Sequence, residues 1–335
     1  SQRTGELLAG LGDVADALVW YRRAHAFEPE SRELFDRIDA LLLGEKRHEE
    51  RVALYRASLD EREGKDRLAA LLVVISAIVL LGVLLFSVGQ GAADGDDDTP
   101  VTIFHPTYLI LAAGIFNAFI PGDLFNLYVG FEILLVASYV LITLGSTESR
   151  IRTGVFYIVV SLVSSILFLA AIAAIYGALG TVNIAQLAER MTQLPQSTQL
   201  VLHLMLLLAF SIKAAVFPLS FWLPDSYPTA PAPVTAVFAG LLTKVGVYAL
   251  IRLVTLLWPE YGLPHQLLLW VACATMLVGV LGAAAQTEVR RILSFHIVSQ
   301  VGYMILGLAL ATPLALAGAV FYLIHHIVVK ANLFF

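Results

Sequence analysis

Residues Leu68–Gly89 read LAALLVVISAIVLLGVLLFSVG, a stretch of 22 residues without a charged side chain. A bilayer core of about 30 Å needs about 20 apolar residues in helical form, so this stretch predicts a transmembrane helix. Eight further apolar runs follow, at 106–121, 123–145, 153–178, 199–221, 231–257, 265–286, 291–311 and 314–335. These runs are continuous rather than alternating, unlike the strands of a membrane β-barrel. The sequence therefore predicts an all-α, polytopic bundle of about nine spans.

Charge is concentrated ahead of the first span. Residues 1–67 hold 27 of the 47 charged side chains, although only 14% of the whole chain is charged and 59% is hydrophobic. An ordinary soluble domain is about 25% charged. The net charge is only −5 and no Lys/Arg-rich run is present, which argues against a nucleic-acid partner. We therefore expect two domains, a polar segment at 1–67 and a transmembrane domain at 68–335.

The polar segment carries a period of 34 residues. Tyr21-Arg-Arg-Ala, which follows Leu11-Gly-Asp-Val-Ala-Asp-Ala-Leu18, returns 34 residues later as Tyr55-Arg-Ala, with Pro29 between them. This spacing resembles the tetratricopeptide repeat over residues 5–63, about one and a half repeats, and would give a protein-binding role. A generic helical hairpin is the alternative. Fewer than three repeats rarely stand alone, so the segment is expected to be truncated.

Arginines in two loops predict the orientation of the bundle. Arg150 and Arg152 follow the third span, and Arg290 and Arg291 follow the seventh. Four spans separate the loops, so both lie on one side, and the excess of arginine marks that side as cytoplasmic. The first span then starts outside, and residues 1–67 would lie there without a visible export signal. Either the topology differs or this segment does not natively belong to the membrane domain.

Four ionisable side chains fall inside predicted spans: Glu132, Lys213, Lys244 and Lys330. A charge at mid-bilayer costs about 2.5–3.5 kcal/mol on insertion scales, so such residues persist mainly where they face partners or water. A static internal ion pair is the structural alternative. Burial favours the neutral forms of acids and amines, whereas an opposite charge nearby favours their charged forms. Moving one charge can thus release a proton from the next, which predicts a relay.

Histidines extend this predicted relay in the last span. His326 lies four residues before Lys330 and shares its helix face, whereas His325 points elsewhere. Imidazole titrates near neutral pH, which suits proton transfer, although a hydrogen-bonded interhelical histidine is also possible. His296 is equally expected to be an interfacial hydrogen-bonding residue. The single cysteine, Cys273, and the absence of zinc-like spacing predict no metal centre.

Proline predicts a break in the fifth span. Pro218 follows Lys213 by five residues in apolar sequence. Proline removes a backbone donor and clashes with the preceding turn, so the helix is expected to be broken near Pro218. Transporters build ion sites at such discontinuous helices. The later prolines of the stretch 224–233 are equally well explained as an interfacial loop.

Five motifs together resemble the antiporter-type subunits of respiratory complex I and its relatives. The motifs are Phe125-Asn-Leu-Tyr-Val-Gly-Phe-Glu132-Ile-Leu-Leu, Lys213-Ala-Ala-Val-Phe-Pro218-Leu-Ser-Phe-Trp-Leu-Pro224, Leu242-Thr-Lys244-Val-Gly-Val-Tyr, Arg290-Arg-Ile-Leu-Ser-Phe-His296-Ile-Val-Ser-Gln-Val-Gly-Tyr303 and His325-His-Ile-Val-Val-Lys330. Within that superfamily, Phe104-His-Pro-Thr-Tyr and Leu135-Val-Ala-Ser-Tyr-Val-Leu-Ile-Thr-Leu-Gly145 are most similar to the D subunits of multisubunit Na+/H+ (Mrp-type) antiporters.

The resemblance implies a fold and a set of roles. It implies fourteen helices in two inverted five-helix repeats, with Glu132 on the fifth, Lys213 on the broken seventh and Lys244 on the eighth. His326 and Lys330 match relay residues of the eleventh. The implied function is Na+/H+ antiport across a bacterial cell membrane, together with the other subunits of a complex and surrounded by lipid. The resemblance implies no redox cofactor.

The sequence departs from the family pattern at both ends, where helices are missing, so a chain truncated at both ends is expected. Two alternative functions stay open. One is a proton-translocating membrane subunit of an NADH-quinone oxidoreductase or membrane hydrogenase. The other is an inactive membrane-anchored scaffold that binds a partner through the repeat-like segment.

Overall fold

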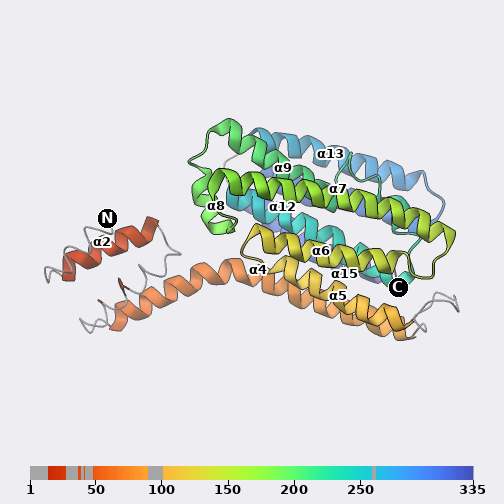
Figure 1. The fold of residues 1–335 in the computed structure, drawn as a ribbon, viewed down its shortest axis with the longest axis horizontal. Helices are drawn as coiled ribbons and strands as arrows, with labels where there is room; N and C mark the ends of the chain where they lie inside the picture. The colour runs from red at the N-terminus through yellow and green to blue at the C-terminus, as the bar shows by residue number, and fades with distance from the viewer. Residues whose placement is uncertain are drawn as a thin grey trace. The chain divides into compact units, whose positions relative to one another are not determined.

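The computed structural model describes residues 14–27, 37–38, 41, 48–89, 101–258 and 262–334. Regular structure in these residues is helical, and their one strand-like feature is an isolated antiparallel bridge between Asp123 and Asn183. The chain divides into two compact units, Ser1–Ala69 and Ala70–Phe335 (Figure 1).

The amino-terminal unit contains helix α2 (Val14–Phe27). Tyr21 is buried, and its hydroxyl accepts a hydrogen bond of 3.3 Å from Arg37 Nη1, with the guanidinium carbon 5.8 Å from the ring centre. Much of the segment 5–63, Pro29 included, lies outside the described residues, so the repeat interpretation stays a prediction. Helix α4 (His48–Gly89) continues without interruption across residue 67, where the sequence predicted a domain boundary.

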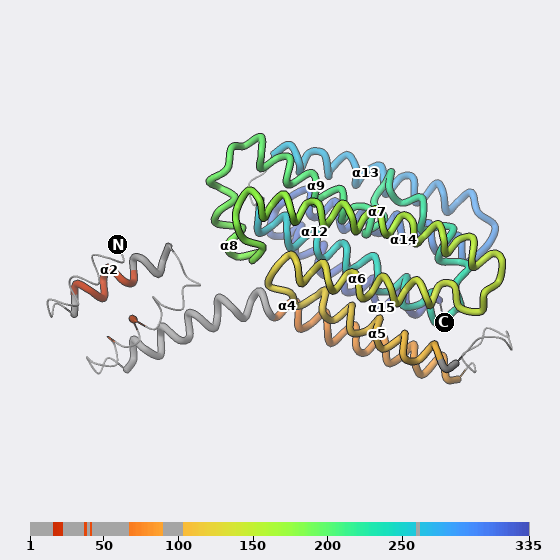
Figure 2. Tube along the Cα trace, in the orientation of Figure 1, coloured from red at the N-terminus to blue at the C-terminus, as the bar shows by residue number. Residues whose placement is uncertain are grey.

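The second unit is a bundle of long helices, which lie roughly alongside one another in Figure 2. After α4 these are α5 (Val101–Phe119), α6 (Leu124–Ile142), α7 (Glu148–Leu179), α9 (Gln196–Ala214), α12 (Thr243–Leu257), α13 (Leu263–Ala284), α14 (Val289–Leu310) and α15 (Pro313–Leu333). Shorter elements are α8 (Ile184–Met191), α10 (Leu223–Ser226), α11 (Ala232–Val237) and the π-helix η1 (Phe238–Leu242).

Apolar side chains on the outer faces fit a bilayer environment. Ile78, Leu109, Ile166 and Trp270 are each at least 65% exposed. Eight of the described helices are long and apolar enough to cross a membrane, with α11, η1 and α12 joined as one span. The predicted α-helical membrane bundle is therefore confirmed. The count differs from the predicted nine, because the described apolar part of α5, Ile103–Phe119, is shorter.

Helix α9 ends earlier than the apolar run predicted. The helix stops at Ala214, and Ala215 adopts a left-handed conformation with φ of 58°. Irregular backbone and turns then lead to α10, with a cis peptide bond before Pro218. The chain thus leaves the helix four residues before the proline, and Pro218 itself is exposed. The end of the helix places Lys213 in the last turn of α9.

Three arginines contact α10 or the connection between α10 and α11. The contacts are Arg150 Nε to Thr229 O (3.2 Å), Arg290 Nη1 to Pro228 O (3.5 Å) and Arg291 Nη2 to Asp225 Oδ1 (2.8 Å). The turns that carry these arginines therefore lie at one end of the bundle. This was predicted, because an even number of spans separates the two loops. We call this end the arginine end.

Candidate ion-translocation site

The site is built around a central span, Ala232–Leu257, which is buried throughout. Two glycines bring it close to helices on two sides. A Cβ atom on Gly240 would lie 3.2 Å from the Ile327 carbonyl oxygen of α15, and one on Gly246 would lie 2.9 Å from the Ala214 nitrogen of α9. Lys244 lies between the two glycines in sequence. The central span therefore positions Lys244 between the helices that carry Lys330 and Lys213.

Lys244 is fully buried and is held by its own helix. Its Nζ donates a hydrogen bond to the carbonyl oxygen of Ala239 in η1 and a second, of 3.2 Å, to Thr243 Oγ1. A π-helical turn alters the regular carbonyl pattern, and such turns are frequent at functional sites. Here the turn supplies the oxygen that receives the Lys244 amine. No pattern in the sequence indicated this turn.

Lys213 is buried among neutral groups. Its Nζ donates a 3.2 Å hydrogen bond to Ser165 Oγ of α7 and lies 4.9 Å from the ring centre of Phe131 on α6. A cation over an aromatic face is attracted by the negative face of the ring, by about 2 kcal/mol or more where both are desolvated. The amine is thus held by a hydroxyl and a ring rather than by a carboxylate.

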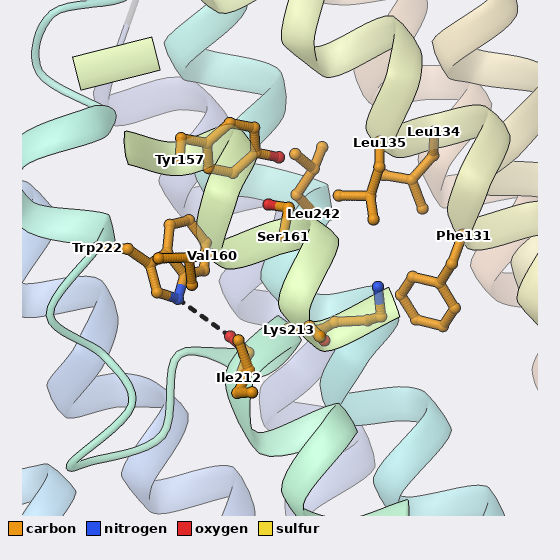
Figure 3. Close-up of a pocket in the computed structure, with 11 residues that line it drawn as sticks. Phe131, Leu134, Leu135, Tyr157, Val160, Ser161, Ile212, Lys213, Trp222 and Leu242 are labelled. Atoms are coloured by element: carbon orange, nitrogen blue, oxygen red, sulfur yellow. Dashed lines mark hydrogen bonds between the residues drawn. The ribbon is translucent and has the colours of Figure 1, made fainter. Parts of the chain in front are cut away.

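A small cavity adjoins Lys213 (Figure 3). Its volume is about 20 Å³, enough for a single water molecule. In Figure 3 the hydroxyls of Tyr157 and Ser161 point into the same space, while Trp222 donates from Nε1 to the Ile212 carbonyl oxygen at 3.1 Å. The cavity is lined by Phe131, Leu134, Leu135, Tyr157, Val160, Ser161, Ser164, Ile212, Lys213, Trp222 and Leu242.

Glu132 follows Phe131 on α6 and belongs to the same region. Its charge interacts with that of Lys213, but within the described residues the two side chains form no ion pair at or below 4.0 Å. One carboxylate oxygen of Glu132 is buried without a hydrogen-bond partner among the described residues. Because a buried polar group is costly without a partner, this acid is poised to take one.

A second cluster joins α14 and α15. Lys330 is fully buried, and its Nζ lies 2.9 Å from Nδ1 of His296. His326 is 2% exposed, and neither of its ring nitrogens has a hydrogen-bond partner in the described chain. The charges of Lys244, Lys330, His296 and His325 all act on His326. For His296 an interfacial hydrogen-bonding role was equally expected, and in the structure it directly contacts a predicted relay lysine.

Two other predicted site residues are exposed. His325 is on the exposed side of α15, with its ring 5.8 Å from that of Tyr322. Pro218 is exposed in the irregular segment after α9. Among the described residues, no group of three or more His, Cys, Asp or Glu side chains is arranged to hold a metal ion.

The geometry defines a polytopic membrane protein with ionisable groups inside the bundle. Residues 121–335 match the family described as NADH:quinone oxidoreductase/Mrp antiporter, transmembrane. The chain belongs to this family. The match includes every predicted site residue, from Glu132 to Lys330.

Similar proteins include subunits of antiporters. The chain is 45% identical over 271 residues to the D subunit of the Na(+)/H(+) antiporter of Alkalihalophilus pseudofirmus, covering 80% of this chain and 54% of the relative. It also resembles a chain in the structure of the Mrp complex from Dietzia sp. DQ12-45-1b, with a TM-score of 0.72 and 37% identity over 80% of this chain and 49% of that one.

A second similar structure belongs to a respiratory complex. It is the membrane-bound sulfane sulfur reductase, an archaeal respiratory membrane complex, with a TM-score of 0.75 and 30% identity over 80% of this chain and 54% of the other. The chain spans about half the length of the relatives it matches.

Proposed function

We propose that this chain is a membrane subunit of a multisubunit monovalent cation (Na+)/proton antiporter in a bacterial cell membrane. Protons move through a relay of Glu132, Lys213, Lys244, His326 and Lys330, and His325 is left out because it lies on the exposed side of α15. The subunit works with other subunits of the complex, in lipid, and acts as a secondary transporter rather than as an enzyme.

The environment of Lys213 carries this proposal. Its amine contacts the Ser165 hydroxyl and the Phe131 ring, while Glu132 interacts from beyond 4.0 Å. An amine locked to a carboxylate keeps its proton, because separating a buried pair costs several kcal/mol. An amine held by neutral groups can exchange its proton as the distant carboxylate changes charge. This arrangement favours a relay over a static ion pair.

The proposal is tested in vesicles that contain the full complex. We expect a sodium gradient to drive proton movement, and Lys213→Ala or Glu132→Gln to reduce it at least tenfold. Glu189→Gln is the matched control, because Glu189 is exposed on α8. Unchanged exchange in both relay variants, with the complex intact, would contradict the assigned relay.

A respiratory role is the second candidate, and the similarity to the archaeal respiratory complex favours it. In that case the chain is a proton-translocating subunit of an NADH-quinone oxidoreductase or membrane hydrogenase. Proton movement that needs NADH or hydrogen, and not sodium, selects this function. The same relay residues would then be required.

For the amino-terminal unit we propose a partner-binding role for a repeat-like helical segment. The buried Tyr21 and its contact with Arg37 fit a helix packed on a second segment. Recovery of the same partner by the full chain and not by a chain lacking residues 1–67 would support this role. Equal recovery by both would contradict it.

A further inference from the structure

Helix α7 carries a row of hydroxyl side chains spaced four residues apart. The row begins at the exposed Ser149, and its less exposed members are Thr153, Tyr157, Ser161 and Ser165. Residues at i and i+4 are neighbours on a helix surface and form a continuous ridge. The same spacing continues with Leu169, Ala173 and Gly177, none of which carries a hydroxyl. The row therefore occupies only one part of α7.

The two ends of the row contact different parts of the molecule. Ser165 accepts the hydrogen bond from Lys213 Nζ, at 3.2 Å. Toward the other end, Thr153 Oγ1 lies 2.9 Å from Thr229 Oγ1, in the connection that the arginines hold. At 1.5 Å per residue, the row from Thr153 to Ser165 covers about 18 Å of the helix axis. It thus runs from the Lys213 amine toward the arginine end.

The middle of the row is buried and borders the cavity. Tyr157 is 1% exposed and its hydroxyl lies 2.8 Å from Ser138 Oγ on α6. Tyr157 and Ser161 both line the cavity beside Lys213, and their hydroxyls point into it in Figure 3. A hydroxyl can donate and accept at the same time, and a water molecule fits in the cavity. The hydroxyl of Ser161 and a water molecule in the cavity can thus bridge the space between Tyr157 and Lys213.

We infer that Thr153, Tyr157, Ser161 and Ser165 form a one-sided proton path between the arginine end and Lys213; this inference rests on the proposed relay. Each hydroxyl accepts one proton from the side of the arginine end and gives up its own toward Lys213. The O–H bond broken at each step is replaced by the one formed, so the hydroxyls end unchanged. The net result is one proton lost by water at the arginine end and gained by the Lys213 amine in its neutral form.

The test measures sodium-driven proton movement by the full complex in vesicles. The combined variant Tyr157→Phe with Ser161→Ala removes two hydroxyls and keeps the aromatic ring. We expect it to slow exchange at least tenfold, to raise the proton concentration that gives half-maximal rate and to leave the apparent KM for sodium within twofold. The single variant Ser161→Thr keeps a hydroxyl at position 161. It should therefore retain most of the wild-type rate.

The matched control is Tyr108→Phe combined with Ser87→Ala. Tyr108 donates to the Leu80 carbonyl oxygen at 2.7 Å and Ser87 to that of Leu84 at 2.7 Å, both away from the row. We expect exchange within twofold of wild type. Wild-type exchange in the Tyr157/Ser161 variant, while Lys213→Ala is inactive, would overturn the path and leave the relay standing. Full exchange in Lys213→Ala would instead overturn the place of Lys213 in the proposed relay and, with it, the path.

Discussion

The Lys330 amine lies 2.9 Å from Nδ1 of His296, so two titratable groups join α15 to α14. One of them, Lys330, is fully buried, whereas His296 is exposed on the described surface. A proton shared between these nitrogens can pass from a buried group to an exposed one. The pair therefore offers the second cluster a way out of the interior of the described bundle.

Replacing His296 tests this pair. His296→Ala leaves Lys330 without this partner, and a hydrogen bond to a charged group contributes about 1.5–3 kcal/mol. We expect sodium-driven proton movement to fall at least tenfold, with partial recovery in His296→Gln, whose amide oxygen can accept from the amine. His105→Ala, on α5, serves as the control. Full activity in His296→Ala would show that the pair takes no part in transfer.

The neighbouring histidines of α15 should behave differently. His326 is buried beside Lys244 and Lys330, whereas His325 is exposed. We expect His326→Ala to reduce exchange at least tenfold and His325→Ala to change it less than twofold. The comparison uses initial rates at equal amounts of assembled complex. Equal losses in the two variants would contradict the separation of these side chains.

The sequence predicted the bundle well because a membrane span is a local property. A run such as Leu68–Gly89 needs only length and apolarity to be recognised. The burial of Lys213, Lys244 and Lys330 was predicted for a similar reason, since an amine inside such a run is costly unless it faces the interior or water. The loop arginines likewise predicted one shared end of the bundle.

Other features depend on contacts that composition does not encode. The π-helix η1 and the bond from Lys244 to its Ala239 carbonyl form where the central span packs on α15 through Gly240. The end of α9 at Ala214, before Pro218, depends on the left-handed Ala215. The contact between His296 and Lys330 depends on how α14 and α15 are aligned along their length, which the sequence alone does not show. The hydroxyl row, in contrast, could have been recognised in the sequence from the four-residue spacing between Thr153 and Ser165.

Gly246 should tolerate no larger side chain. In Gly246→Ala the new Cβ would lie 2.9 Å from the Ala214 nitrogen and 3.0 Å from the Lys213 carbonyl carbon, both backbone atoms. Overpacking of this kind costs about 1–3 kcal/mol. We expect a lower melting temperature for the purified complex and slower exchange. Gly177→Ala is the control, because nothing lies within 4 Å of a Cβ there; equal melting temperatures would contradict the close approach of α12 to α9.

Two arginines at the arginine end should contribute very differently to the stability of the fold. Arg150 is 9% exposed and donates to the carbonyl oxygens of Thr229 and, at 3.1 Å, Leu144. Losing such bonds leaves buried acceptors unpaired, at about 1–3 kcal/mol each. Arg291 instead pairs with Asp225 where the two side chains are 43% and 53% exposed, and exposed pairs contribute only about 0–1 kcal/mol.

Arg150→Ala should therefore lower the melting temperature of the complex strongly and Arg291→Ala only slightly. Arg150→Lys should not rescue the first variant, because a single ammonium lacks the planar fork of donors that reaches both carbonyls. Thermal unfolding at low and high salt separates the two cases further, since salt screens the exposed pair and leaves the buried bonds almost unaffected. Similar losses in the two alanine variants would contradict this difference, because they would mean that the exposed ion pair stabilises the fold as much as the bonds of buried Arg150.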